Sequence, residues 1–135
     1  MTESADTGAV AVKVIEYHQP ADLANVRQLV TQQATAAGMT TDKALALSVA
    51  VNELAVYSLR DPRNGGGGVV SIWATATEVR VTVAVEGYLT RVSHMRPLDD
   101  PAAEHGLLLV GALCDQVHIR EHADGVTVHI SMARN

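Results

Sequence analysis

The sequence predicts an α/β two-layer sandwich, in which a mixed, mainly antiparallel sheet carries about three helices on one face. Three observations lead to this fold class. Short alternating segments occur in pairs that a tight turn can join. Two longer segments have apolar residues at helical spacing. The order strand, helix, helix, strand, strand, helix, strand, strand differs from the regular alternation of a doubly wound sheet.

The composition is that of one globular domain. The chain has 135 residues, of which 47% are hydrophobic and 19% are charged. We expect a flexible, polar tail over residues 1–8 and a single domain over residues 9–135. The net charge of −5 and the lack of a run of Lys or Arg argue against direct nucleic-acid binding. No signal peptide or long uncharged apolar stretch is present, so we expect a cytoplasmic protein without a membrane segment.

The first half of the domain predicts one strand and two helices. Ala9–His18 alternates as a strand does, and the helix that follows should end near Gly38. Thr40 and Thr41 can cap the next helix, which is predicted over Thr41–Leu59. That second helix is apolar nearly all the way round, so we expect it to be central in the domain.

The second half predicts two hairpins and a helix. Val69–Thr75 and Glu78–Glu86 read as paired strands, Pro101–Cys114 as a helix, and Gln116–His122 with Val126–Ala133 as the last hairpin. The single cysteine, Cys114, is predicted to be a buried structural thiol.

The last hairpin should have a core face and a polar face. If Asp124 and Gly125 form its turn, Ile119 pairs with Ile130, and Val117 with Met132, on the core side. The opposite face then carries a polar set: His118, Arg120, His122, Thr127, His129 and Ser131. These histidines could form a metal site or a solvated or interface surface. We favour the second, because no spacing of carboxylate or Cys ligands supports a metal. A partner bound there would bind in a pH-dependent way at about pH 6 to 7.

Two other features bear on chemistry. Gly65–Gly68 lacks the Lys and the following helix of a phosphate loop, so we interpret it as a flexible connector. Glu53, Tyr57 and Asp61 lie four residues apart on one face of the central helix, beside Asn52. A carboxylate there either lines a cavity with polar partners or faces solvent, and the residues alone favour neither.

Several segments carry a family resemblance. They are Leu45–Asp61 on the central helix, Pro20–Arg27 before it, Val81–Gly87 at the end of a strand, Glu104–Val110, and the terminal hairpin with its Asp-Gly turn. In this order and spacing they resemble the GHKL (Bergerat-type) ATPase domain, and most of all the anti-sigma-factor serine kinases of partner-switching systems. The resemblance covers about residues 9 to 133, and it implies the same two-layer fold.

On the central helix, the resemblance implies one retained and two replaced positions. Glu53 matches the Glu that acts as general base toward a serine hydroxyl. Tyr57 stands where the family has the Asn that helps to hold Mg²⁺, and Asp61 stands at a His position. Asn52 is the neighbouring amide that could supply a metal contact instead.

The other nucleotide-contacting positions are also partly replaced. Val85 stands where the family has the Asp that reads the adenine amino group, whereas Gly87 of that turn is kept. Glu104 replaces the first Gly of the second glycine box, and Gly106 is kept. A carboxylate at this point repels a triphosphate.

The resemblance implies a regulator that acts by binding a protein partner, either a sigma factor or an anti-sigma antagonist, with nucleotide binding weakened or lost. We expect no cofactor, or ATP with Mg²⁺ if the site still works, and no resident metal. The kinase-like fold is expected to have weak or no activity, and relatives often form homodimers. The alternatives are an active ATP-dependent serine kinase that uses Glu53 as its base, and an unrelated α/β binding domain.

Overall fold

The structure, a computed structural model, describes residues 11–60, 67–86, 109–122 and 125–135. Its strands are β1 (Lys13–Tyr17), β2 (Gly68–Ala74), β3 (Glu78–Glu86), β4 (Gln116–Glu121) and β5 (Gly125–Ala133). Its helices are α1 (Leu23–Ala36), which a short 3-10 turn at Pro20–Asp22 precedes, and α2 (Thr41–Arg60). Residues 109–113 form a further helical turn, and Cys114 follows it. Residues 101–108 of the helix predicted over Pro101–Cys114 lie outside the described residues.

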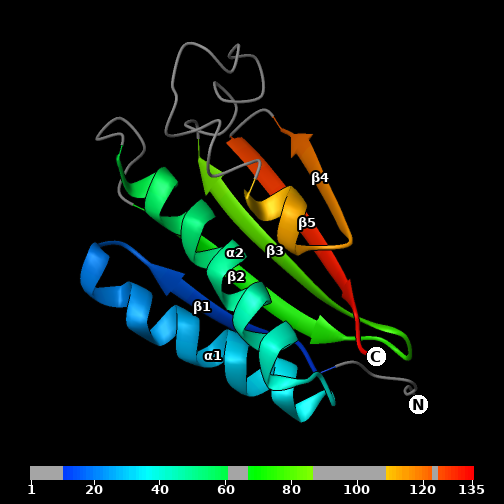
Figure 1. The fold of residues 1–135 in the computed structure, drawn as a ribbon. Helices are drawn as coiled ribbons and strands as arrows, with labels where there is room; N and C mark the ends of the chain where they lie inside the picture. The colour runs from blue at the N-terminus through cyan, green and yellow to red at the C-terminus, as the bar shows by residue number, and fades with distance from the viewer. Residues whose placement is uncertain (1–10, 61–66, 87–108, 123–124) are drawn as a thin grey trace, which may run out of the picture.

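The strands form one sheet with the order β1-β2-β3-β5-β4, and all four pairings are antiparallel. The predicted two-layer sandwich is confirmed, and the sheet described is wholly antiparallel. Figure 1 shows α1, α2 and the helical turn at residues 109–113 on the same side of this sheet. Neither described helix is long and apolar enough to cross a membrane.

The core lies between the sheet and the helices because the strands alternate. On β3, Val79, Val81, Val83 and Val85 are buried, whereas Arg80 is exposed. Strand β5 buries Val126, Val128, Ile130 and Met132 in the same way. The opposite, outer face of the sheet therefore carries the polar residues of both strands.

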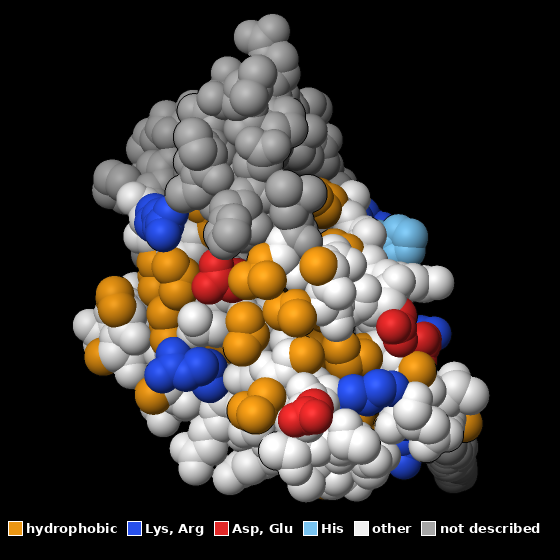
Figure 2. Space-filling model, viewed as in Figure 1, with side chains coloured by type: hydrophobic (Ala, Val, Ile, Leu, Met, Phe, Trp, Pro, Cys, Tyr) orange, Lys and Arg blue, Asp and Glu red, His pale blue; other side chains and the backbone are white. Residues whose placement is uncertain are grey.

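Helix α2 begins and ends close to the predicted positions. The hydroxyl Oγ1 of Thr40 accepts a hydrogen bond from the backbone N–H of Lys43 at 3.2 Å, as expected of an N-cap. The apolar residues nearly all the way round α2 predicted that it is central in the domain, but one side of the helix is exposed. Leu45 and Val49, one turn apart, have 53% and 43% of their surface exposed, and Figure 2 shows hydrophobic side chains at the surface among charged ones. Helix α1 covers only the neighbouring face of α2.

The pairing of the last hairpin differs from the predicted register. Val117 pairs with Ile130 and Ile119 with Val128, two residues away from the predicted partners Met132 and Ile130. The ladder continues to Glu121 and Val126, and the N–H of His122 donates to the carbonyl of Gly125 at 2.7 Å. Gly125, which was predicted to be a turn residue, is therefore the first residue of β5 and pairs with Glu86 on β3. A shift of two residues keeps the side chains on their predicted face, since strands repeat every two residues. Ile119, predicted on the core side, nevertheless has 40% of its surface exposed.

Two glycines of the Gly65–Gly68 run lie in tight packing. Gly67 has φ of +131°, and a Cβ atom at this position would overlap the carbonyl oxygen of Tyr17. A Cβ on Gly68 would lie 2.6 Å from the carbonyl oxygen of Ala84. The prediction of a flexible connector does not hold for these two residues, because side chains would not fit where β2 enters the sheet.

Candidate nucleotide site and the outer sheet face

The α2 positions that match the nucleotide site differ in environment. Glu53 is half-buried, whereas Tyr57, one turn later, has only 4% of its surface exposed and belongs to the hydrophobic core. The phenol ring of Tyr57 is thus a packing element. Glu53 and Tyr57, which the sequence placed on one face of the helix, therefore differ: the Glu53 carboxylate is partly solvated, whereas Tyr57 lies in the core.

Val85 is also a core residue. It lies near the end of β3, has 4% of its surface exposed and pairs with Gly68 on β2 and Val126 on β5. Its side chain belongs to the same buried cluster as Tyr57. Two positions that carry nucleotide-contacting groups in the resembled family are therefore occupied here by buried side chains.

Asn52 is engaged on the other side of α2. Its amide oxygen Oδ1 accepts a hydrogen bond from the guanidinium Nη1 of Arg27 on α1 at 2.9 Å. This contact links the two helices across their interface. The remaining predicted site residues, Asp61, Gly87, Glu104 and Gly106, lie outside the described residues.

A buried hydrogen-bond chain near the end of α2 was not predicted. The hydroxyl of Ser58 donates to the carbonyl of Ala55 at 2.8 Å, and the Tyr17 hydroxyl lies 2.6 Å from the Ser58 oxygen. Since the Ser58 proton is directed at Ala55, Tyr17 is the donor in the second bond. Burial raises the pKa of Tyr17 to about 12. A serine in an otherwise apolar helix was the signal that could have indicated this contact.

Cys114 is buried, as predicted, and burial together with the nearby charge of Asp115 raises its pKa to about 11. A thiol with so high a pKa is a poor nucleophile at neutral pH, because little thiolate is present. Its role is packing.

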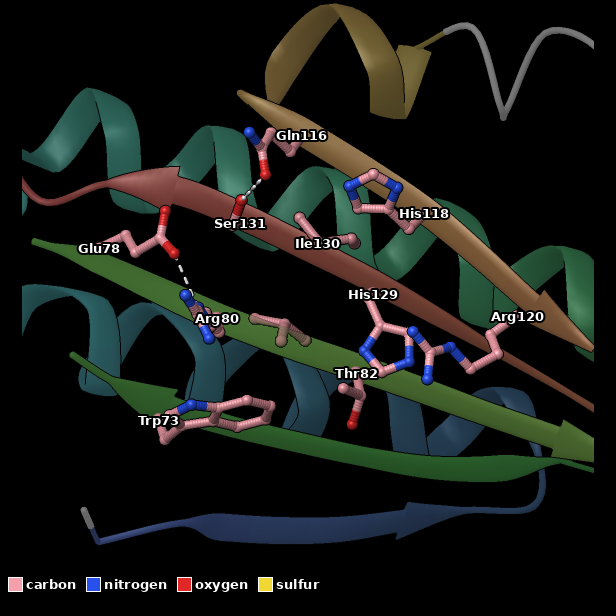
Figure 3. Close-up of a pocket in the computed structure, with 11 residues that line it drawn as sticks. Trp73, Glu78, Arg80, Thr82, Gln116, His118, Arg120, His129, Ile130 and Ser131 are labelled. Atoms are coloured by element: carbon pink, nitrogen blue, oxygen red, sulfur yellow. Dashed lines mark hydrogen bonds and ion pairs between the residues drawn. The ribbon is translucent and has the colours of Figure 1, made fainter. Parts of the chain in front are cut away.

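The outer sheet face holds a shallow pocket, which we call the outer-face groove (Figure 3). It crosses β2, β3, β5 and β4, and its volume is about 220 Å³. Its lining is mostly polar: Trp73, Glu78, Arg80, Val81, Thr82, Gln116, His118, Arg120, His129, Ile130 and Ser131.

Part of the predicted polar face of the last hairpin lines this groove, namely His118, Arg120, His129 and Ser131, whereas His122 and Thr127 do not. His118 and His129 pair directly across β4 and β5, and the ring Nε2 of His122 lies 2.8 Å from the hydroxyl of Thr127. In the described part of the chain, no three His, Cys, Asp or Glu side chains form a group that could hold a metal ion. The cations and hydrogen-bond donors of this surface are the side chains of Arg80, Arg120, His118 and His129.

The pKa of His129 is lowered from its ordinary value of 6.5, first by burial and then by the charges of Arg120, His118 and His122. The unfolded chain therefore binds more protons than the folded one as the pH falls below about 6.5. The contribution of His129 to the free energy of unfolding is therefore complete above that pH and is lost in acid.

We expect an NMR titration to place the His129 pKa below 6.5. In the Arg120→Gln variant, the His129 pKa should rise only part of the way toward 6.5, because burial is the larger cause of its lowering. An unchanged pKa in Arg120→Gln would contradict the assigned charge effect.

A search of curated proteins found no significant match to this chain. The family model for the histidine kinase-like ATPase domain matches residues 17–132. That match spans every described strand and helix except the first residues of β1 and the last residue of β5. The chain therefore belongs to the family of histidine kinase-like ATPase domains.

Proposed function

We propose that this protein is a regulator that acts by binding a protein partner in the cytoplasm, as an anti-sigma factor of a partner-switching system does, and that its nucleotide site is weakened or lost. The single observation that carries the proposal is the burial of Tyr57 and Val85 in the hydrophobic core. The histidine kinase-like fold is retained while two positions that would contact the nucleotide have become packing positions. The partner would be a sigma factor or its antagonist, and the regulator would form a homodimer.

Tyr57, which stands at the Mg²⁺-holding position of the resembled family, supports this proposal first. Mg²⁺ requires a close octahedral shell of oxygen ligands at about 2.0–2.1 Å. A short amide side chain can supply such an oxygen at the edge of a site. The Tyr57 ring is packed in the core and offers no amide oxygen as an Asn would.

Val85, which stands at the adenine-reading position of the resembled family, supports the proposal independently. An adenine amino group that enters a protein site needs an acceptor, and the side chain of Val85 has none. A buried donor left without its acceptor costs about 1–3 kcal/mol. Because about 1.4 kcal/mol is a factor of ten in affinity, this loss together with a lost metal ligand weakens ATP binding by about a hundredfold or more.

A second candidate, an active ATP-dependent serine kinase, is favoured by Glu53. This residue keeps the place of the general base and remains half-buried on α2. Such a kinase would need another metal ligand. Asn52 would have to give up the hydrogen bond that its oxygen accepts from Arg27.

Titration with Mg-ATP distinguishes the two functions. We expect no heat of binding and no change in melting temperature at about 1 mM Mg-ATP, since a ligand at a hundred times its Kd would stabilise the fold by about 2.7 kcal/mol. The matched control is Mg-ATP with the Arg27→Gln variant, in which Asn52 is released from its partner. Micromolar binding by the wild-type protein would contradict the proposal. In that case, loss of serine phosphorylation in Glu53→Gln with unchanged ATP affinity would establish the kinase.

A further inference from the structure

The outer face of the sheet is a surface that the nucleotide site does not use. Helices α1 and α2 pack on the opposite side (Figure 1), and the residues that alternate with the buried valines point outward. The outer-face groove lies on this surface, and it crosses four of the five strands.

The charge of the groove is opposite to that of the whole chain. The chain has a net charge of −5, but the groove contains Arg80 and Arg120 against one carboxylate, Glu78. That carboxylate is already paired, because its Oε1 lies 2.7 Å from the Nε of Arg80. Arg120 forms no ion pair with any of the residues that the structure describes. Among the described residues, the positive charge of Arg120 therefore has no carboxylate that offsets it.

Imidazoles lie on the same face as this cation (Figure 3). Figure 3 shows the Arg120 guanidinium beside the His129 ring, with His118 on the same face. His118 and Arg120 come from β4 and His129 from β5, and His122 contributes a further charge effect on His129. Two groups face His129 from β3. Thr82, its direct partner in the ladder, is uncharged, and the charge of Arg80 is offset by Glu78. A proton gained by any of these rings makes the groove more positive.

The shape of the groove favours part of a larger ligand. Its volume of about 220 Å³ is below the range of roughly 300–1,000 Å³ that enclosed small-molecule sites occupy. Trp73 lies at the β2 end as an apolar platform, whereas Arg120 and the histidines lie toward β4 (Figure 3). Aromatic and Arg side chains are the residues that most often dominate protein–protein contacts.

We infer that the outer-face groove binds an acidic segment of a protein partner, whose carboxylates contact Arg120, His118 and His129 and whose apolar side chains pack on Trp73, and that this binding tightens as the pH falls. An anion beside an imidazole favours its protonated form, so proton uptake and binding support each other. This inference deepens the proposed function by giving the chemistry of a partner, but it uses a surface on the other side of the sheet.

Trp73 provides a direct measurement, because it is the only tryptophan in the chain. The probe is a fluorescein-labelled peptide of nine residues, with glutamates around two central leucines, added to the full chain at low salt. Fluorescence anisotropy gives the affinity, and Trp73 emission, measured with an unlabelled copy, locates the binding. We expect about tenfold tighter binding at pH 6 than at pH 8, about what one additional close charge pair adds at an interface.

Matched variants assign the effect to the groove. Arg120→Gln should weaken binding about fivefold at both pH values, and the double variant His118→Gln, His129→Gln should remove most of the pH dependence. Lys13→Gln and His18→Gln remove a cation and an imidazole that do not line the groove, and neither should change the affinity. Circular dichroism of each variant shows whether it folds.

Several results would overturn the inference. They are no binding of the acidic peptide at 1 mM, equal binding of the same peptide with glutamine in place of glutamate, or an affinity that Arg120→Gln leaves unchanged. Tighter binding of a nine-nucleotide oligothymidylate would assign the groove to nucleic acid instead. Because the readout is Trp73 and no nucleotide is present, failure here leaves the Mg-ATP result intact, and the reverse also holds.

Discussion

Replacing Gly67 with alanine is expected to lower the free energy of unfolding by about 3 kcal/mol or more, because a left-handed backbone costs a residue with a Cβ about 1–2 kcal/mol and overpacking adds about 1–3 kcal/mol. The φ angle of Gly67 is +131°. The atom that the new methyl group would overlap is the carbonyl oxygen of Tyr17, which belongs to the β1 backbone and cannot rotate away. Chemical denaturation followed by circular dichroism measures the change.

Two other glycines separate the contributions. Gly38 has φ of +92° but no atom within 4 Å of a built Cβ, so Gly38→Ala should cost only the backbone term, about 1 kcal/mol. Gly111 lies in the helical turn with open space around it. Gly111→Ala should therefore stabilise the protein by about 0.5–1 kcal/mol. An equal loss for Gly67→Ala and Gly38→Ala would show that the contact with Tyr17 does not matter.

Replacing Tyr57 with asparagine, the residue of the resembled family, is expected to destabilise the fold by about 3–5 kcal/mol, since removing a buried aromatic ring leaves a cavity of that cost. Tyr57 has 4% of its surface exposed and lies in the core between α2 and the sheet. A residue at the edge of an open ligand site would tolerate this change. Thermal and urea unfolding give the loss, and Mg-ATP titration of the same variant reports any recovered nucleotide affinity.

The control for Tyr57→Asn is Glu53→Gln, one turn earlier on the same helix. Glu53 is half-buried, so we expect its replacement by an isosteric amide to change stability by less than about 0.5 kcal/mol. If Tyr57→Asn is as stable as the wild-type protein, Tyr57 is not a packing residue, and the argument from its burial fails.

Most of the sheet could be predicted from local patterns. The β2–β3 pair and the valine face of β3 follow from strict alternation, which dictates the face of each side chain as soon as the strand forms. The Thr40 cap and the extent of α2 follow from the capping and spacing rules in the same way. These features depend on neighbours along the chain, so a single sequence contains them.

The register of the last hairpin could not be predicted as well. Turn residues near Asp124 and Gly125 allowed more than one turn position, and pairings two residues apart place the same side chains on the same face of the sheet. The choice depends on how far the ladder extends, which is a matter of hydrogen bonds between strands. Leu45 and Val49 show a related limit: an apolar helix indicates burial, but the neighbours decide which sides are covered.

By itself, the sequence determined the element order, the faces of the strands and the polar set on the last hairpin, because alternation and helical spacing are local. It also indicated the family resemblance, and the match over residues 17–132 confirms the histidine kinase-like ATPase domain. Only the tertiary structure decided that Tyr57 and Val85 are buried in one core, that Gly67 is packed against Tyr17, and that Arg120 lies beside His129 without a carboxylate partner among the described residues. The physical reason is that burial, overlap and charge pairing depend on contacts between segments that are distant in the sequence, and these exist only when the sheet and its helices have packed together.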